Sequence, residues 1–267
     1  MRKTLLLSAI AAGVLGIVVA AYAANTYKVD LAQVAPSKAG TFKHPKPERL
    51  RFGYTVSTTD GNRPATSTDQ QVGFGPGLRQ NSKLKNGIKF VFPQCKQTQA
   101  SSNACPAKAK VGSGVVNNYA GLQSDPSQKI PCLLNLTIFN GDGRVFPPSQ
   151  NDGRSVRADL WLQLKGGPPS CPLVVDAPIP AQFIPFKGGT SLKFHITKVP
   201  FQNPQTGVEN SVINVTASLY KLATVKGKTR GYFESVLCPK GGHPFVVTFT
   251  DSSGAKATAS KKASCTK

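Results

Sequence analysis

Apolar and polar residues alternate with a period of two through much of this 267-residue chain. The clearest run is Val156–Lys165, where Val156, Ala158, Leu160, Leu162 and Leu164 alternate with Arg157, Asp159, Trp161, Gln163 and Lys165. Residues 49–56 alternate in the same way, which is typical of a strand with one buried face. Beyond residue 23 no stretch of about 12 residues has the 3.6-residue period of an amphipathic helix.

Less regular alternation indicates further strands at 88–92, 133–139, 192–199, 212–222, 232–237 and 245–251. Turn sequences separate them: Asn86-Gly87, Gly141-Asp142-Gly143, Asp152-Gly153, Gly166-Gly167, Gly188-Gly189, Gly241-Gly242 and Ser253-Gly254. These residue types supply the positive φ angles of tight hairpins. The fold class is therefore all-β, and we expect a β-sandwich, jelly-roll or immunoglobulin-like, with long loops. The pattern is compatible with one sandwich domain over residues 49–267 or with two sub-domains.

The first 23 residues have the pattern of a signal peptide. Met1-Arg2-Lys3 precedes an uncharged apolar run over residues 4–20, and Ala21-Tyr22-Ala23 offers a cleavage site. An uncleaved anchor is the alternative, because the run approaches the length of a membrane span. Residues 24–48 contain Pro36, Pro45, Pro47 and several lysines, and we expect an extended lead-in segment there. The predicted location is secreted, extracellular or cell-wall-associated.

Six cysteines agree with export, because secreted chains commonly carry structural disulfides. They lack the C-x-x-C spacing of zinc or redox motifs, and sequence alone allows 15 pairings. Short separations favour Cys95–Cys105, Cys132–Cys171 and Cys238–Cys265.

Several short motifs, in this order, resemble those of an uncharacterised family of secreted actinobacterial proteins. They are Asn25-Thr26-Tyr27, Pro36-Ser37-Lys38-Ala39-Gly40, Lys43-His44-Pro45-Lys46-Pro47, Arg63-Pro64, Phe92-Pro93-Gln94-Cys95, Cys105-Pro106, Val111-Gly112-Ser113-Gly114, Gly231-Tyr232 and Phe249-Thr250-Asp251. The resemblance covers most of the chain after the signal peptide. It implies export and a disulfide-stapled β fold, and it brings no known activity and no catalytic residues.

Catalytic motifs are scarce. His44, His195 and His243 are expected on loops or at the surface, and their spacing does not predict a metal site. Gly112-Ser113-Gly114 is not a nucleophile elbow. Carboxylate pairs could serve a glycosidase, and Asp142, Asp152 and Asp159 are the candidates, although Asp142 and Asp152 lie in Gly-containing turns that favour Asp for local reasons. We expect no enzyme activity, no metal and no cofactor.

Charge is the strongest functional signal. The chain has 33 Lys and Arg against 12 Asp and Glu, a formal net charge of +21. Between Asp69 and Asp125 there is no acidic residue, and a basic surface is predicted from Arg79, Lys83, Lys85, Lys89, Lys96, Lys108 and Lys110. Such a field attracts polyanions and makes binding salt-dependent. Specific nucleic-acid recognition is not expected, because no recognition helix or set of stacking aromatics accompanies the charge.

Trp161 is the one residue that stands out as a ligand contact. Alternation places it opposite the apolar face, in line with Asp159 and Gln163, where an aromatic ring could stack on a sugar. The alternative is that Trp161 packs beneath a loop or a second sheet, since Trp is usually largely buried.

These features lead to one functional hypothesis and two alternatives. The hypothesis is a non-catalytic secreted protein that binds an anionic cell-wall polymer, polysaccharide or other carbohydrate of the envelope through its basic surface, with membrane contact only through an uncleaved N-terminal segment. The first alternative is a polysaccharide hydrolase that uses an Asp pair. The second is a surface-layer or fibre subunit with an exposed apolar sheet edge.

Overall fold

The computed structural model describes residues 24–81, 92–171, 174–197, 202–203 and 207–267. The signal-peptide prediction therefore lies outside the described residues. The strands are β1 Asn25–Ala35, β2 Lys46–Thr58, β3 Ser67–Phe74, β4 Leu78–Gln80, β5 Lys110–Leu122, β6 Ile130–Asn140, β7 Val145–Phe146, β8 Val156–Arg157, β9 Leu160–Gly166, β10 Val175–Phe186, β11 Gly189–His195, β12 Gln202–Asn203, β13 Val208–Leu219, β14 Leu222–Val225, β15 Lys228–Gly231, β16 Phe233–Ser235, β17 His243–Asp251 and β18 Lys256–Ala263. The described helices are α1 Gln97–Ser101, η1 Ala107–Ala109 and η2 Pro148–Gln150.

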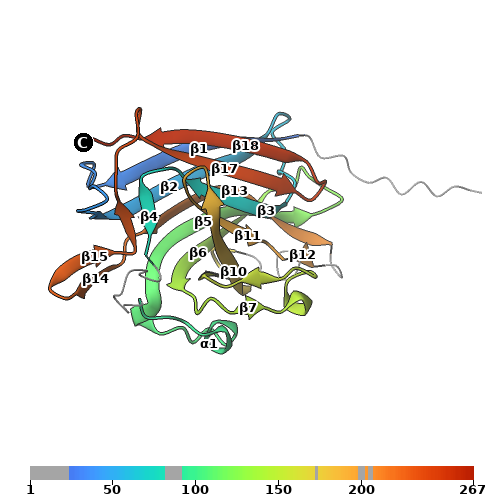
Figure 1. Cartoon of the computed structure of the whole chain (residues 1–267). Helices are drawn as coiled ribbons and strands as arrows, with labels where there is room; N and C mark the ends of the chain where they lie inside the picture. Colours follow the sequence, from blue (N-terminus) through green and yellow to red (C-terminus); the bar gives the residue numbers. More distant parts are fainter. Residues whose placement is uncertain (1–23, 82–91, 172–173, 198–201, 204–206) are drawn as a thin grey trace, which may run out of the picture.

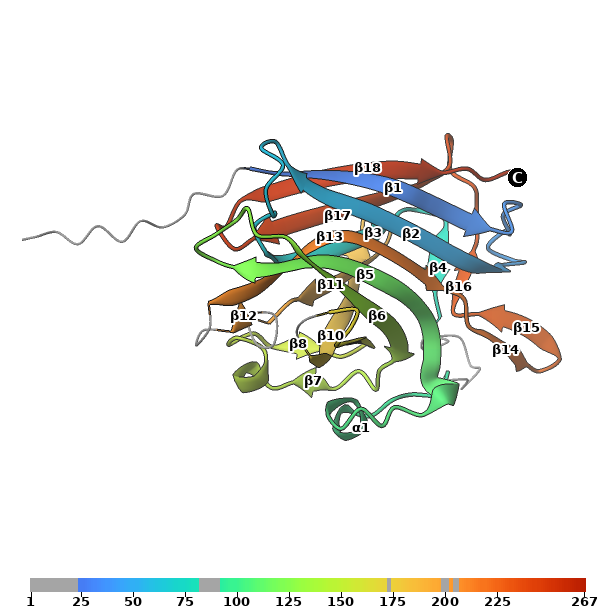
Figure 2. The same cartoon turned by 180° about the vertical axis from the view of Figure 1, so that it is seen from behind.

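Antiparallel pairing joins most of these strands into one large sheet, which confirms the all-β prediction (Figure 1). The order is β18-β17-β3-β11-β10-β9-β6-β5-β13-β2-β16-β4, and β1 pairs with β2. The sheet folds over on itself to form the two layers of a sandwich, so that β1 and β18 lie side by side (Figure 2). The Lys261 Nζ donates to the Asp30 carbonyl across that seam at 2.5 Å.

Aromatic side chains from the two layers meet in the core. Phe52 of β2 contacts Phe74 of β3 edge-on at 5.8 Å, and Tyr54 contacts Phe249 of β17 at 5.0 Å between ring centroids. On β9, Leu160, Leu162 and Leu164 face this same core, as their alternation predicts. The period-two pattern therefore predicted correctly which face of β9 packs against the core.

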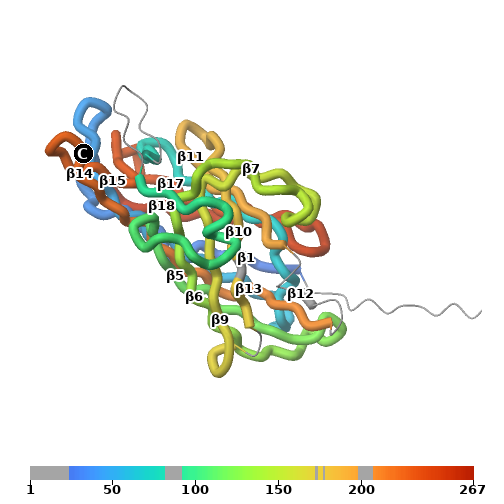
Figure 3. The backbone as a smooth tube through the Cα atoms, turned by 90° about the horizontal axis from the view of Figure 1, so that it is seen from below, coloured from blue at the N-terminus to red at the C-terminus, as the bar shows by residue number. Residues whose placement is uncertain are grey.

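A second, smaller core lies on the other face of β9 and β6. It contains Cys95, Ala100, Ala109, Phe139, Phe146, Ala158 and Trp161, and the segments before β5 and between β6 and β9 supply its cover. Because these segments cover the sheet, β9 is buried on both faces from Leu160 to Leu164. Figure 1 shows α1 and β7 at the bottom of the molecule, and Figure 3 views the molecule from that side.

All three predicted disulfides are present: Cys95–Cys105, Cys132–Cys171 and Cys238–Cys265. The first closes the segment that carries α1, the second joins β6 to the residues before β10, and the third ties the C-terminal residues to the loop before β17. Disulfides of this kind are typical of proteins outside the reducing cytosol. None of the helices in the described part of the chain is long and apolar enough to cross a membrane.

The lead-in prediction for residues 24–48 is wrong in its main part. Residues 25–35 form β1, which pairs with β2 along its length, so the sandwich begins before residue 49. The prolines that suggested a lead-in lie at 36, 45 and 47, around the turn from β1 to β2. There the missing N–H groups interrupt few ladder bonds.

Strands β3, β5, β10 and β18 were not predicted. In β5, Gly112 and Gly114 break the alternation because β13 runs too close for a side chain. A Cβ on either glycine would lie 2.3 Å from a carbonyl oxygen of β13, that of Ser218 or Thr216. β18 consists of Lys, Ala, Ser and Thr and is exposed along most of its length, so it has no apolar face to detect. The strand expected at 88–92 falls almost entirely outside the described residues.

Candidate functional site

The basic end of the sandwich is the leading candidate site. Antiparallel pairing makes β2, β11 and β17 begin at the end where β1, β3, β10 and β13 finish. The connections there bring together nine cations from distant parts of the sequence, which we call the basic end: Lys38, Lys43, Lys46, Lys187, Lys221, Lys226, Lys228, Arg230 and Lys240. Each of these side chains is exposed or half-buried. In Figure 1 the C-terminus and the projecting hairpin β14–β15 mark this end on the left.

The acidic residues of these connections do not offset the charge at the surface. In the segments 36–48, 74–81, 186–190 and 220–243 the acids are Glu48 and Glu234, which are 2% and 0% exposed. Arg230 donates to both oxygens of Glu234, at 2.5 and 2.8 Å, and Arg79 donates to it at 2.8 Å. Burial pushes the pKa of Glu234 up, but the bonds from Arg230 and Arg79 outweigh it and hold the pKa below its ordinary value. The lysines of the basic end therefore face solvent, and the described segments that carry them contain no exposed Asp or Glu side chain.

Two hairpins present a lysine at the tip in an unfavourable backbone conformation. Lys226-Gly227 and Lys187-Gly188 form two-residue turns in which both residues have positive φ, and Lys226 and Lys187 have φ of 49° and 42°. Turns of this type favour Asn, Asp or Gly at the first position. A Lys there costs about 1 kcal/mol through contact of its Cβ with the backbone. Backbone strain of this kind is often found at functional positions.

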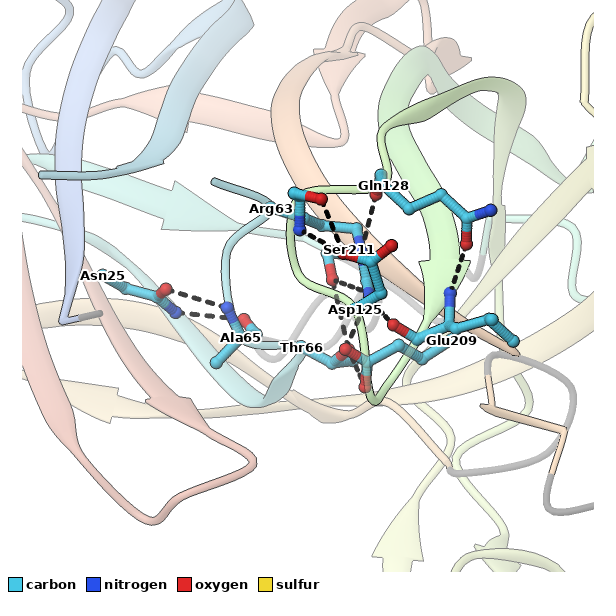
Figure 4. Close-up of polar contacts among 10 residues, drawn as sticks. Asn25, Arg63, Ala65, Thr66, Asp125, Gln128, Glu209 and Ser211 are labelled. Atoms are coloured by element: carbon cyan, nitrogen blue, oxygen red, sulfur yellow. Dashed lines mark hydrogen bonds and ion pairs between the residues drawn. The ribbon is translucent and has the colours of Figure 1, made fainter. Parts of the chain in front are cut away.

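At the opposite end, one cation and one acid are paired in the interior. Arg63, which is fully buried, donates to Glu209 at 2.7 Å, to the Leu122 carbonyl at 2.6 Å and to the Gln128 carbonyl at 3.2 Å (Figure 4). This ion pair ties the loop after β2 to the loop after β5 and to β13. The exposed Asp60 and Asp125 lie at this end as well, and local hydrogen bonds, from the Asn62 backbone and the Ser127 side chain respectively, lower the pKa of each. Asp60 and Asp125 therefore lie at the end of the sandwich opposite the basic end.

The predicted basic surface only partly coincides with the basic end. Arg79 reaches it but is engaged by Glu234. Lys108 and Lys110 lie just before and at the start of β5, and Lys96 precedes α1, so these three belong to the side that covers the second core. Lys83, Lys85 and Lys89 lie outside the described residues. No local sequence pattern indicates that Lys38, Lys43 and Lys187 lie beside the lysines of residues 221–240.

The predicted sugar-contact strip of Trp161, Asp159 and Gln163 is not a surface. Trp161 is fully buried, and its ring packs edge-on against Phe146 at 5.4 Å. Gln163 is buried and donates to Asn103. Asp159 accepts from Arg157 at 2.7 and 2.8 Å and from the Phe183 backbone N–H at 2.9 Å. Alternation put these residues on the correct face of β9, but the second core covers that face.

The three carboxylates of the hydrolase alternative each have a basic partner of their own. Asp142 lies 3.8 Å from Arg144, Asp159 pairs with Arg157, and Asp152 lies 3.1 Å from His195 Nε2. Among the described residues no group of three or more His, Cys, Asp or Glu side chains is arranged to hold a metal.

A polar cluster around His195 was not foreseen. His195 ends β11 opposite Asp69 of β3, and its Nδ1 lies 3.3 Å from the Asp69 carboxylate while its Nε2 faces Asp152. Arg154 also pairs with Asp69. A neutral imidazole has one N–H, so only the doubly protonated ring donates to both carboxylates. The cluster fastens the 147–155 segment onto the sheet, and no local sequence pattern links these residues.

His195 and His243 are 6% and 0% exposed, which corrects their expected positions on loops or at the surface. The His243 Nδ1 lies 3.3 Å from the Pro76 carbonyl, and its Nε2 has no hydrogen-bond partner among the described residues. Burial lowers the pKa of His243, so the neutral ring is favoured. His44 is exposed in the loop between β1 and β2, as expected.

Comparison with known proteins adds no assignment to this geometry. No protein-family model matches the chain, and no curated protein matches it significantly.

Proposed function

We propose that this chain is a non-catalytic binding protein of the cell envelope, exported by its N-terminal segment, that holds an anionic component with its basic end. The observation that carries the proposal is the excess of positive charge at the basic end. Nine cations gather where the only acids of the same segments, Glu48 and Glu234, are buried. An uncompensated cationic surface concentrates anionic ligands and accelerates their association.

The disulfides and the resemblance to secreted actinobacterial proteins support export to a compartment in which anionic polymers and lipids are the abundant ligands. The tip lysines add a second line of support, because Lys226 and Lys187 occupy positions that a purely structural turn would give to Asn or Gly. The hydrolase alternative has no comparable observation in its favour, since Asp142, Asp152 and Asp159 are each tied to a basic side chain.

The test is retention on purified envelope fragments and on immobilised polyphosphate across a salt series from about 50 mM to about 1 M, over which the Debye length falls to roughly 3 Å. Lys226→Gln/Lys228→Gln removes two charges from the basic end. Lys129→Gln/Lys256→Gln removes two exposed charges from the opposite end and serves as the matched control.

We expect the first variant to bind about tenfold more weakly at about 0.15 M salt, since each lysine near an anionic surface contributes about 1 kcal/mol before screening. The control should bind as the wild type does. Equal losses in the two variants would mean that net charge alone attracts the ligand, and the basic end would not be a site. Failure of the wild type to bind either matrix at low salt would also refute the proposal.

A further inference from the structure

The basic end also carries two exposed apolar side chains. Phe42 is 71% exposed in the loop between β1 and β2, and Leu222 is 53% exposed at the start of β14. Each has a cation as its sequence neighbour, Lys43 and Lys221. Single exposed apolar residues are normal on protein surfaces, so their placement among the cations is what needs an explanation.

The loop that carries Phe42 is held firmly. The Ala39 N–H donates to the Thr266 carbonyl at 2.8 Å, and the Gly40 N–H donates to the Ser235 hydroxyl at 2.9 Å. A Cβ on Gly40 would lie 2.5–2.7 Å from three backbone atoms, so only glycine allows this close approach. The backbone before Phe42 is thus anchored to β16 and to the C-terminal residues, and the ring itself points away from the core.

Leu222 is positioned by the hairpin β14–β15. It pairs with Gly231, and a Cβ on Gly231 would meet Pro47 at the start of β2 at 2.9–3.0 Å. The Arg230–Glu234 ion pair fixes the other strand of the hairpin. The two anchored segments that carry Phe42 and Leu222, the loop between β1 and β2 and the hairpin β14–β15, both lie at the left of Figure 1.

We propose that the anionic component is a lipid surface, into which Phe42 and Leu222 insert while the lysines of the basic end contact the phosphates. This inference rests on the proposed function and names its partner. A hydrated polyanion would satisfy the lysines and leave both apolar side chains in water. An anionic bilayer satisfies both, because peripheral proteins bind it by combining cationic contacts with shallow insertion of aromatic and aliphatic side chains.

The test uses the chain from Ala24, which contains every strand and disulfide described and lacks the apolar run that would itself insert. Vesicles of about 30% phosphatidylglycerol in phosphatidylcholine are compared with pure phosphatidylcholine vesicles by co-sedimentation. Phe42→Ser/Leu222→Ser is the test variant. Val145→Ser/Val174→Ser is the matched control, since these side chains are 61% and 78% exposed away from the basic end.

We expect binding to the anionic vesicles only, a loss of at least about tenfold for Phe42→Ser/Leu222→Ser, and no change for the control. Phe42→Trp should also show a blue-shifted emission on the anionic vesicles, against the constant signal of the buried Trp161. Binding of the test variant as tightly as wild type would overturn the insertion.

Retention on immobilised polyphosphate without binding to anionic vesicles would overturn the lipid inference and leave the proposed function standing. In that case the ligand is a soluble or wall-bound polyanion. Binding to neither would refute both. Equal binding to the two vesicle types would refute the role of the lysines in this site.

Discussion

Glu48 should make the fold less stable as pH rises. Its side chain is 2% exposed at the start of β2. Oε1 accepts from the Ser235 hydroxyl at 2.5 Å, and Oε2 has no hydrogen-bond partner in the part of the chain that the structure describes. Burial raises its pKa from 4.5 to about 7, against smaller opposing effects of Ser235 and Lys46. The folded protein therefore keeps a proton that the unfolded chain releases between these two values.

The sign follows from proton binding. Between pH 4.5 and about 7 the folded state binds more protons than the unfolded state, so the free energy of unfolding decreases as pH increases. At 1.36 kcal/mol per pKa unit, the whole effect is about 3 kcal/mol, and most of it falls between about pH 5 and about pH 8. His243 acts in the opposite direction, because its lowered pKa makes the fold less stable as pH falls.

The assay is urea unfolding of wild type and Glu48→Gln at about pH 5 and about pH 8. Glutamine keeps the Ser235 contact and cannot ionise, so any cost of its unpaired amide is the same at both pH values. Contributions of His243 are common to both proteins and cancel in the difference. We expect the stability of Glu48→Gln relative to wild type to rise by about 2–3 kcal/mol from the lower to the higher pH. A change below about 0.5 kcal/mol would refute the reasoning.

Four further predictions test the fold. Gly114→Ala should destabilise the protein by about 1–3 kcal/mol in urea unfolding, because the new methyl group would meet the β13 backbone; an unchanged midpoint would show that the two strands can separate. Glu209→Gln should cost about 3–5 kcal/mol by leaving the buried Arg63 uncompensated, and a neutral result would mean that water reaches this site. Replacing Cys132 and Cys171 with Ala should cost about 2–5 kcal/mol in thermal or urea unfolding, and a smaller loss would assign the stability to the core alone. His195→Ala should make the 147–155 segment more sensitive to limited proteolysis without changing binding at the basic end, and an unchanged cleavage rate would show that the ion pair from Arg154 suffices.

Local sequence patterns determined the fold class, the inward faces of the regular strands and all three disulfide pairs. The alternation of Leu160, Leu162 and Leu164 is enough to set their direction, because side chains alternate strictly along a strand. The cysteine pairing could be predicted from the sequence because each disulfide joins cysteines that are only 10 to 39 residues apart.

Where sequence interpretation failed, the cause was contact between distant segments. The glycines of β5 serve the close approach of β13, and nothing near Gly112 or Gly114 in sequence reveals it. Trp161 alternates as an exposed residue would, but a second core formed by segments from both sides of β5 and β6 covers it. A period-two pattern reports which side of the strand a residue occupies and carries no information on whether that side is covered.

For the candidate site, too, some features follow from the sequence and others only from the tertiary structure. Sequence by itself determined the excess of positive charge and most of the lysines that contribute to it. Only the tertiary structure decided that nine cations share one end of the sandwich, that Glu48 and Glu234 are withdrawn from its surface, and that Phe42 and Leu222 accompany them. The physical reason is that the net charge is a sum over residues and can be counted from the sequence. A charged surface, in contrast, is formed by strand ends that antiparallel pairing brings together from distant parts of the sequence.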